Sequence, residues 1–135
     1  MSYASYKTLG QVVQQPGTQL PELPQITSQE HRNHYIQEYR VLVIDNYTEW
    51  CGPCKQIDPQ IRELAQQYPG QIYFVRENVD DEIEGAPQIT GVPCFHFYAE
   101  GKYISELTIT GGDVEAVKNT CNQIVTKINN FSSPK

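Results

Sequence analysis

The chain has 135 residues, a formal net charge of −6 and a pI near 4.9. This length suits one domain with its own core, and we expect that domain at residues 22–130, after a polar Gln/Pro-rich extension at 1–21 and before a short tail at 131–135. The acidic balance and the scattered basic residues argue against nucleic-acid or membrane partners and favour protein partners.

The extension carries Lys7 as its only charge, and residues 9–13 are its one short apolar run. A loosely packed arm and a partner-binding segment both remain open for it. No signal-peptide pattern and no apolar stretch of membrane-spanning length occurs, so we expect a cytoplasmic protein. The four cysteines do not form a secreted disulfide framework, since only two of them are closely spaced.

After the extension, the pattern predicts a short strand at residues 23–27 and a helix at 28–39 that begins at a Thr or Ser cap. Residues 41–44 form a continuous aliphatic run, which is typical of a strand buried on both faces. Asp45 follows this run directly. From the residues alone, it is either a strand-end acid that caps a turn or a functional carboxylate.

Two histidines of the predicted helix, His31 and His34, lie three residues apart and could face one metal ion. No further ligand has a matching spacing, so no metal site is expected.

The hexapeptide Trp50-Cys51-Gly52-Pro53-Cys54-Lys55 follows the buried strand. Two cysteines with this spacing can close a small reversible disulfide. Gly52 allows a tight turn and Pro53 suits the first turn of a helix, so the motif is expected to begin a helix that runs to Tyr68. Cys51 then lies at the positive end of the helix dipole, which favours its thiolate, and Cys54 lies close enough to attack a mixed disulfide formed on Cys51.

This hexapeptide is similar to the active-site motif of thioredoxins, and the resemblance extends over residues 22–130, including Pro59 inside the helix. It implies an α/β thioredoxin-like fold, with a central mixed sheet that helices flank on both faces. It also implies that Asp45 is a buried acid that acts through a water as a base toward Cys54, with a pKa raised by burial. Arg76 stands where many members have a lysine near this acid.

Beyond the motif, the predicted elements are a strand at residues 71–75, a shortened helix within 81–89, a strand at 94–99, a hairpin turn at 100–102, a strand at 103–109 and a helix after Asp113. The apolar stripe of the last helix contains Val114, Val117, Cys121, Ile124, Val125 and Ile128.

The resemblance also implies a substrate groove beside the two cysteines. Pro93 would be cis and face them, the backbone of Val92 would pair with an extended substrate, and Trp50 and Lys55 would shape the rim. Gly111 or Gly112 would line the same groove. Cys94 departs from the family, in which many members have threonine there, and it is either a buried filler or a third reactive thiol.

The activity that the resemblance implies is reduction of protein disulfides through a reversible Cys51–Cys54 pair, with roles in electron transport and redox homeostasis. No bound cofactor is expected, and electrons would come from NADPH through a flavoprotein thioredoxin reductase or another donor. A monomer is expected, with a dimer left open. Two alternatives are an oxidase or isomerase of the same fold and a binding module that joins an assembly with little turnover.

Overall fold

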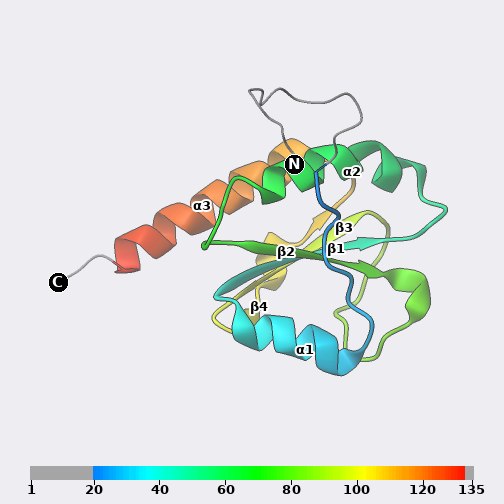
Figure 1. The fold of residues 1–135 in the computed structure, drawn as a ribbon, viewed down its shortest axis with the longest axis horizontal. Coiled ribbons are helices and arrows are strands. Elements are labelled where there is room, and N and C mark those ends of the chain that lie inside the picture. Colours follow the sequence, from blue (N-terminus) through cyan, green and yellow to red (C-terminus); the bar gives the residue numbers. More distant parts are fainter. Residues whose placement is uncertain (1–19, 133–135) are drawn as a thin grey trace, which may run out of the picture.

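The computed structural model describes residues 20–132 (Figure 1). Its elements in chain order are α1 (Gln29–Glu38), β1 (Val41–Tyr47), α2 (Gly52–Ala65), β2 (Tyr73–Asn78), the 3-10 helix η1 (Val79–Asp81), β3 (Cys94–Ala99), β4 (Lys102–Tyr103), the 3-10 helix η2 (Ser105–Leu107), β5 (Ile109–Thr110) and α3 (Val114–Ser132). The expectations for the N-terminal extension fall on residues 1–19 for the most part, and these lie outside the described residues.

One sheet organises these elements, with β1 at its centre. The strand order is β2-β1-β3-β4, and β5 pairs with the other end of β3. β1 runs parallel to β2 and antiparallel to β3, so the predicted mixed sheet is confirmed. Every residue of β1 is buried, as the aliphatic run indicated, although the strand continues three residues further than predicted, to Tyr47.

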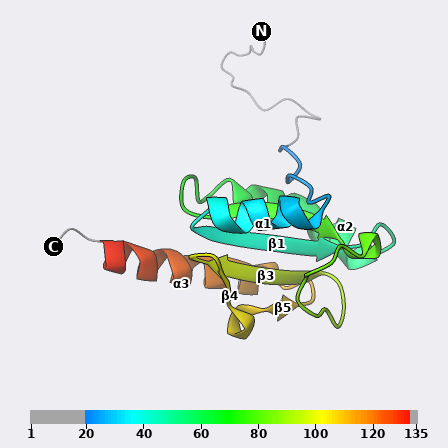
Figure 2. The same ribbon diagram turned by 90° about the horizontal axis from the view of Figure 1, so that it is seen from below.

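Helices cover both faces of this sheet, with α1 on one face and α2 and α3 on the other (Figure 1). Alternation along β1 sends Leu42 and Ile44 into the core under α1, and Val41 and Val43 into the larger core under α2 and α3. The apolar stripe predicted for the last helix packs on this larger core. Figure 2 shows β4 and β5 beyond β3, at the edge of the sheet.

The predicted strand at residues 23–27 is reduced to a single bridge. Gln25 pairs in parallel with Arg76 of β2, the N–H of Ile26 donates to the carbonyl of Arg76 at 2.8 Å, and the N–H of Arg76 donates to the carbonyl of Pro24 at 2.9 Å. Pro24 has no N–H of its own, which limits the pairing. β2 itself begins two residues later than expected and runs to Asn78.

The shortened helix expected within residues 81–89 is wrong. Only η1 forms there, and residues 82–93 contain neither helix nor strand. Glu82 and Gly85 adopt positive φ angles of 51° and 91°, and both values are incompatible with a right-handed helix. Pro87 also lacks the N–H that a helix interior needs. The backbone carbonyls of Ile83 and Glu84 bond instead to a side chain of α1.

The strand expected at residues 103–109 is also wrong, because η2 interrupts it. The N–H of Ile104 still donates to the carbonyl of Phe97 in β3 at 2.9 Å. The next turn bonds internally, with Leu107 donating to Ile104 and Thr108 to Ser105, each at 3.1 Å. This turn satisfies its own backbone groups and lets Leu107 and Ile109 both pack against the larger core.

The start of α1 depends on Ser28, whose hydroxyl accepts a hydrogen bond from the N–H of His31 at 3.0 Å. We expect Ser28→Ala to lower the free energy of unfolding by about 1 kcal/mol, since one orphan N–H at the helix start then loses its partner. Urea unfolding checks this. Ser105→Ala is the matched control, since Ser105 is exposed and makes no side-chain cap. Equal losses in the two variants would contradict the assignment of the cap.

Candidate active site

The two closely spaced cysteines form a disulfide at the start of α2. Their Cα atoms are 5.3 Å apart. Cys51 is the N-cap of the helix, and its Sγ accepts a hydrogen bond from the N–H of Cys54 at 3.1 Å. Pro53 stands in the first turn, as its fixed φ predicts. A sulfur in this position faces unpaired N–H groups, which stabilise a thiolate once the pair is reduced.

The expectation that Gly52 is needed for a tight turn is wrong, however. Gly52 belongs to α2 and has no positive φ, and a Cβ added there would meet nothing within 4 Å. The turn before the helix therefore does not require the backbone freedom of glycine at this position.

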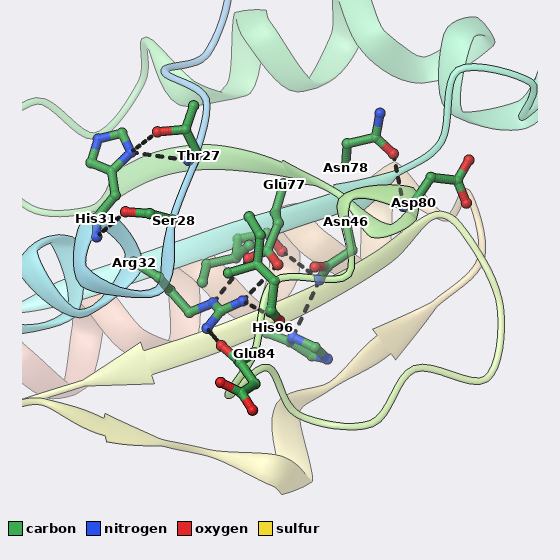
Figure 3. Close-up of polar contacts among 12 residues, drawn as sticks. Thr27, Ser28, His31, Arg32, Asn46, Glu77, Asn78, Asp80, Glu84 and His96 are labelled. Carbon is green, nitrogen blue, oxygen red and sulfur yellow. Dashed lines mark hydrogen bonds and ion pairs between the residues drawn. The ribbon is translucent and has the colours of Figure 1, made fainter.

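The residue that precedes the disulfide is exposed, whereas the two cysteines are buried. Trp50 is 72% exposed, whereas Cys51 and Cys54 are only 4% and 8% exposed. The indole N–H of Trp50 donates to a carboxylate oxygen of Asp80 at 2.9 Å, which fixes the exposed ring beside the motif. Figure 3 shows Asp80 in η1, directly after β2, where its N–H bonds to the side chain of Asn78.

Of the residues expected to form the groove, Val92 contacts the disulfide cluster, and Gly111 bonds to Pro93, the next residue in the chain. Val92 packs against the buried cluster of Tyr47, Cys51 and Cys54. The Val92–Pro93 peptide bond is cis, and the N–H of Gly111 donates to the carbonyl of Pro93 at 2.7 Å. Gly111, with a φ of 111°, therefore lies beside the proline, directly after β5, and Gly112 follows one residue farther along the chain.

Asp45 is buried in β1, on the sheet face that α2 covers. Burial raises the pKa of its carboxyl from 3.8 to about 7, against the opposing effect of the Arg76 guanidinium and with a smaller contribution from Asp58. Arg76 is the residue of β2 directly in register with Asp45, and its Cζ lies 3.7 Å from the ring centroid of Tyr47. A carboxyl with this pKa can exchange a proton near neutral pH.

Asp45 and Cys54 line one pocket of about 180 Å³ that opens to solvent. Its remaining walls are polar or charged for the most part: Tyr47, Thr48, Glu49, Lys55, Asp58, Arg62 and Arg76. The hydroxyl of Thr48 and the Nε of Arg62 are buried in this wall without a hydrogen-bond partner among the described residues. A pocket of this volume and polarity admits water, and water can carry a proton between the carboxyl and the sulfur.

Cys94 is buried at the start of β3, directly after Pro93 in the chain. Burial raises the pKa of its thiol, and a hydrogen bond from the Thr110 hydroxyl, at 3.8 Å, acts in the opposite direction. The Nε2 of His96 lies 3.6 Å from the same sulfur. The thiol is 1% exposed and uncharged at neutral pH, and these are the properties of a packed side chain.

Two ion pairs were not predicted from the sequence. Asp58 and Arg62 pair at 2.7 Å in the pocket wall, and Arg32 of α1 pairs with Glu77 of β2 at 2.7 Å in the interior. The sequence contains a signal for a residue of each pair. Asp58 and Arg62 have the i,i+4 spacing of a helical ion pair, and Arg32 stands four residues before Ile36, on the packed face of α1.

In the described part of the chain, no cluster of three or more His, Cys, Asp or Glu side chains has an arrangement that could hold a metal ion. His31 instead accepts a hydrogen bond on Nδ1 from the N–H of Thr27 at 3.1 Å. No helix within residues 20–132 has the length and apolar character needed to cross a membrane.

Comparison with known proteins finds thioredoxins both among family models and among individual relatives. The family model described as Thioredoxin matches residues 22–127. Thioredoxin 1 of Plasmodium falciparum is 32% identical over 95 residues, which cover 69% of this chain and 88% of the relative. A chloroplastic M-type thioredoxin of Brassica napus is 33% identical over 82 residues, 59% of this chain. The chain spans 46% of that relative's length and 36% of a thioredoxin-like protein of Schizosaccharomyces pombe.

Solved structures show the same similarity. Mitochondrial thioredoxin 3 of Saccharomyces cerevisiae, in its oxidised form, matches with a TM-score of 0.69 and 30% identity, covering 75% of this chain and 94% of that one. A structure that concerns thiol resolution in yeast mitochondrial 1-Cys peroxiredoxin via glutathione and thioredoxin systems matches with a TM-score of 0.65 and 26% identity, covering 78% of this chain and 99% of that one.

The raised pKa of Asp45 makes stability depend on pH in a defined direction. Between pH values of 3.8 and about 7 the unfolded chain has released a proton that the folded chain retains, so this contribution to stability is lost as the pH rises through that window. We expect Asp45→Asn to raise the free energy of unfolding by ~4 kcal/mol at about pH 8.5 and to leave it nearly unchanged near pH 4. Urea unfolding of the two oxidised proteins measures both values. An equal gain at both pH values would contradict the assignment.

Asp58 contributes to the raised pKa of Asp45, and it also neutralises Arg62 in the same pocket wall. We expect Asp58→Asn to lower the pKa of Asp45, since a negative charge is lost and a positive charge is left uncompensated. Titration of the Asp45 carboxyl carbon by NMR measures the change. Glu63→Gln, on the exposed side of the same helix, serves as the control and should leave the titration where it was. A rise in Asp58→Asn would overturn this interpretation.

Proposed function

The chain belongs to the thioredoxin family, and from this we propose that it is a thiol-disulfide oxidoreductase that reduces disulfide bonds of other proteins. The observation that carries the proposal is the Cys51–Cys54 disulfide at the N-terminus of α2, with Cys54 and the buried carboxyl of Asp45 lining one pocket that opens to solvent. A dithiol there can donate two electrons and return to the disulfide without any other change in the chain.

The reaction begins from the reduced pair. The thiolate of Cys51 attacks one sulfur of the substrate disulfide, so that a mixed disulfide forms and the other substrate sulfur leaves as a thiolate that takes up a proton. Cys54, deprotonated, then attacks Cys51 Sγ, which closes the Cys51–Cys54 bond and releases the second substrate thiol. Two electrons have passed from the protein to the substrate.

Asp45 serves the second step. Cys54 must lose its proton while the mixed disulfide exists, and the buried carboxylate that lines the same pocket is that of Asp45. Its pKa of about 7 suits transfer of that proton through water at neutral pH. The proton then leaves toward solvent, to which the pocket opens.

The substrate binds beside the exposed ring of Trp50, along the backbone of Val92 next to Pro93. Val92 packs on the disulfide cluster, so an extended peptide that bonds to its backbone brings a disulfide to Cys51. The similar structure that concerns a 1-Cys peroxiredoxin supports a protein, rather than a small molecule, as the substrate.

The oxidised pair needs a two-electron donor for each cycle. A flavoprotein thioredoxin reductase that draws on NADPH is the proposed donor, with no cofactor bound to this chain. Cys94 and Cys121 are free thiols in the described residues, which supports a reducing, cytoplasmic location.

Reduction of insulin disulfides with dithiothreitol as donor tests the proposal. The wild type is expected to accelerate the reaction, and Cys51→Ser to return it to the rate with dithiothreitol alone. Cys54→Ser should stop at the mixed disulfide, which mass spectrometry detects as a covalent adduct of the substrate on Cys51.

Cys94→Ser is the control for this assay. Its buried, uncharged thiol takes no part in the steps above, so the variant should keep the wild-type rate. A wild type no faster than dithiothreitol alone would favour a binding module over an enzyme. Activity that survives in Cys51→Ser would place the chemistry elsewhere.

A further inference from the structure

The segment of residues 82–92 joins η1 to Pro93 without helix or strand, and it ends in the groove residue Val92. Such a segment cannot fix its own shape through the hydrogen bonds of a helix. Among the described residues, the backbone of 85–91 makes no hydrogen bond, so the segment is held at its two ends. The far end is the bond from Gly111 to the carbonyl of Pro93.

The near end is held by hydrogen bonds from Arg32 of α1, a side chain that is only 1% exposed (Figure 3), and by the packing of Ile83 on the smaller core. Its Nη1 donates to the carbonyl of Glu84 at 2.6 Å, and its Nη2 donates to the carbonyl of Ile83 at 3.2 Å. These two carbonyls are groups that the missing helix leaves without backbone partners.

Glu77 holds the guanidinium in place. Its carboxylate accepts hydrogen bonds from Nε of Arg32 at 3.0 Å and from Nη2 at 2.7 Å, in the two-pronged geometry that suits arginine. Glu77 is itself 4% exposed and belongs to β2, in register with Asn46 of β1. The anchor of the segment is therefore part of the sheet.

A second polar group lies next to this ion pair in the sheet, because Asn46 of β1 is in register with Glu77. Asn46 donates from Nδ2 to the carbonyl of Cys94 at 2.9 Å and lies 3.2 Å from Nδ1 of His96 (Figure 3). Burial, with help from the charge of Arg32, lowers the pKa of His96 to about 4, so its imidazole is neutral and can accept from Asn46. These polar contacts link β1 to β3 directly after Pro93.

Gly85 allows the segment to approach this closely. A Cβ at this position would lie 2.8 Å from Nε2 of Gln29 and 3.3 Å from Nη1 of Arg32, and its φ is 91°. Glycine is the residue that accepts both the close contact and the positive φ. The backbone turns here directly over the guanidinium.

On these contacts, and resting on the proposed function, we propose that Arg32 is a positioning residue for substrate binding: through Glu77 and the carbonyls of Ile83 and Glu84 it holds the 82–92 segment, and with it Val92, where a protein substrate pairs. A buried ion pair is weak evidence for stability, because desolvation offsets its attraction. Placement of an irregular segment is a role that apolar side chains could not perform, since they cannot donate to its carbonyls.

Two variants separate placement from stability. Arg32→Lys keeps the charge but loses the planar fork that reaches Glu77 and both carbonyls. The double variant Arg32→Met/Glu77→Leu removes both charges together, which preserves folding because no buried charge is left unpaired. Arg40→Gln is the control, since Arg40 lies on the surface, where it pairs with Glu100.

The readout compares a large and a small substrate, with dithiothreitol as donor. For insulin, both variants are expected to raise KM about tenfold, equivalent to roughly 1.4 kcal/mol, with kcat unchanged. For hydroxyethyl disulfide, which is too small to pair with Val92, the rates should match those of the wild type. Proteolytic cleavage within residues 82–92 should quicken, and hydrogen exchange in β1 should stay unchanged.

The outcomes are distinguishable. Wild-type activity together with an unchanged KM for insulin in both variants overturns this inference alone. Equal losses with both substrates indicate a general loss of structure and overturn it as well. A wild type that reduces neither disulfide overturns the proposed function, and this inference falls with it.

Discussion

The site depends on one constraint, the burial of β1 along its whole length between two hydrogen-bonded neighbours. A strand held on both edges and covered on both faces has a single register, because a shift of one residue would move every side chain to the opposite face. Its last three residues, Asp45, Asn46 and Tyr47, are therefore presented in fixed directions. The disulfide follows only after a short turn, so the strand sets the distance between carboxyl and sulfur.

Alternation then places two different polar groups on opposite faces of the same strand end. On the face under α2, Asp45 lies beside Arg76 and shares a pocket with Cys54. On the face under α1, Asn46 lies in register with Glu77 on one side and Cys94 on the other. Asp45 provides a carboxyl that titrates, whereas Asn46 is a neutral side chain that donates a hydrogen bond to the backbone of Cys94. Function is divided between the two faces of one sheet.

These polar groups stand where an apolar core would be more stable. A carboxyl with a pKa of about 7 is stable in the fold as an acid, and its ionisation near neutral pH opposes folding. The same property allows it to exchange a proton with a thiol whose reaction requires one. Departures from apolar packing beside the disulfide are thus consistent with a site selected for chemistry rather than stability, and the long aliphatic run before Asp45 offsets their cost.

What the sequence determined by itself was local. The Trp50–Lys55 motif, the cap at Ser28 and the uninterrupted run of β1 are written in neighbouring residues, and spacing alone predicts a disulfide at a helix start. The tertiary structure decided what depends on distant residues. Arg32 and Glu77 are 45 positions apart, yet they pair, and Arg32 also bonds to two carbonyls of the loop that stands where a helix was expected. Asp58 influences Asp45 only because α2 covers that face of β1. A periodic pattern records which residues are apolar, whereas the partner of a buried charge is chosen by the packing of elements, which no local pattern contains.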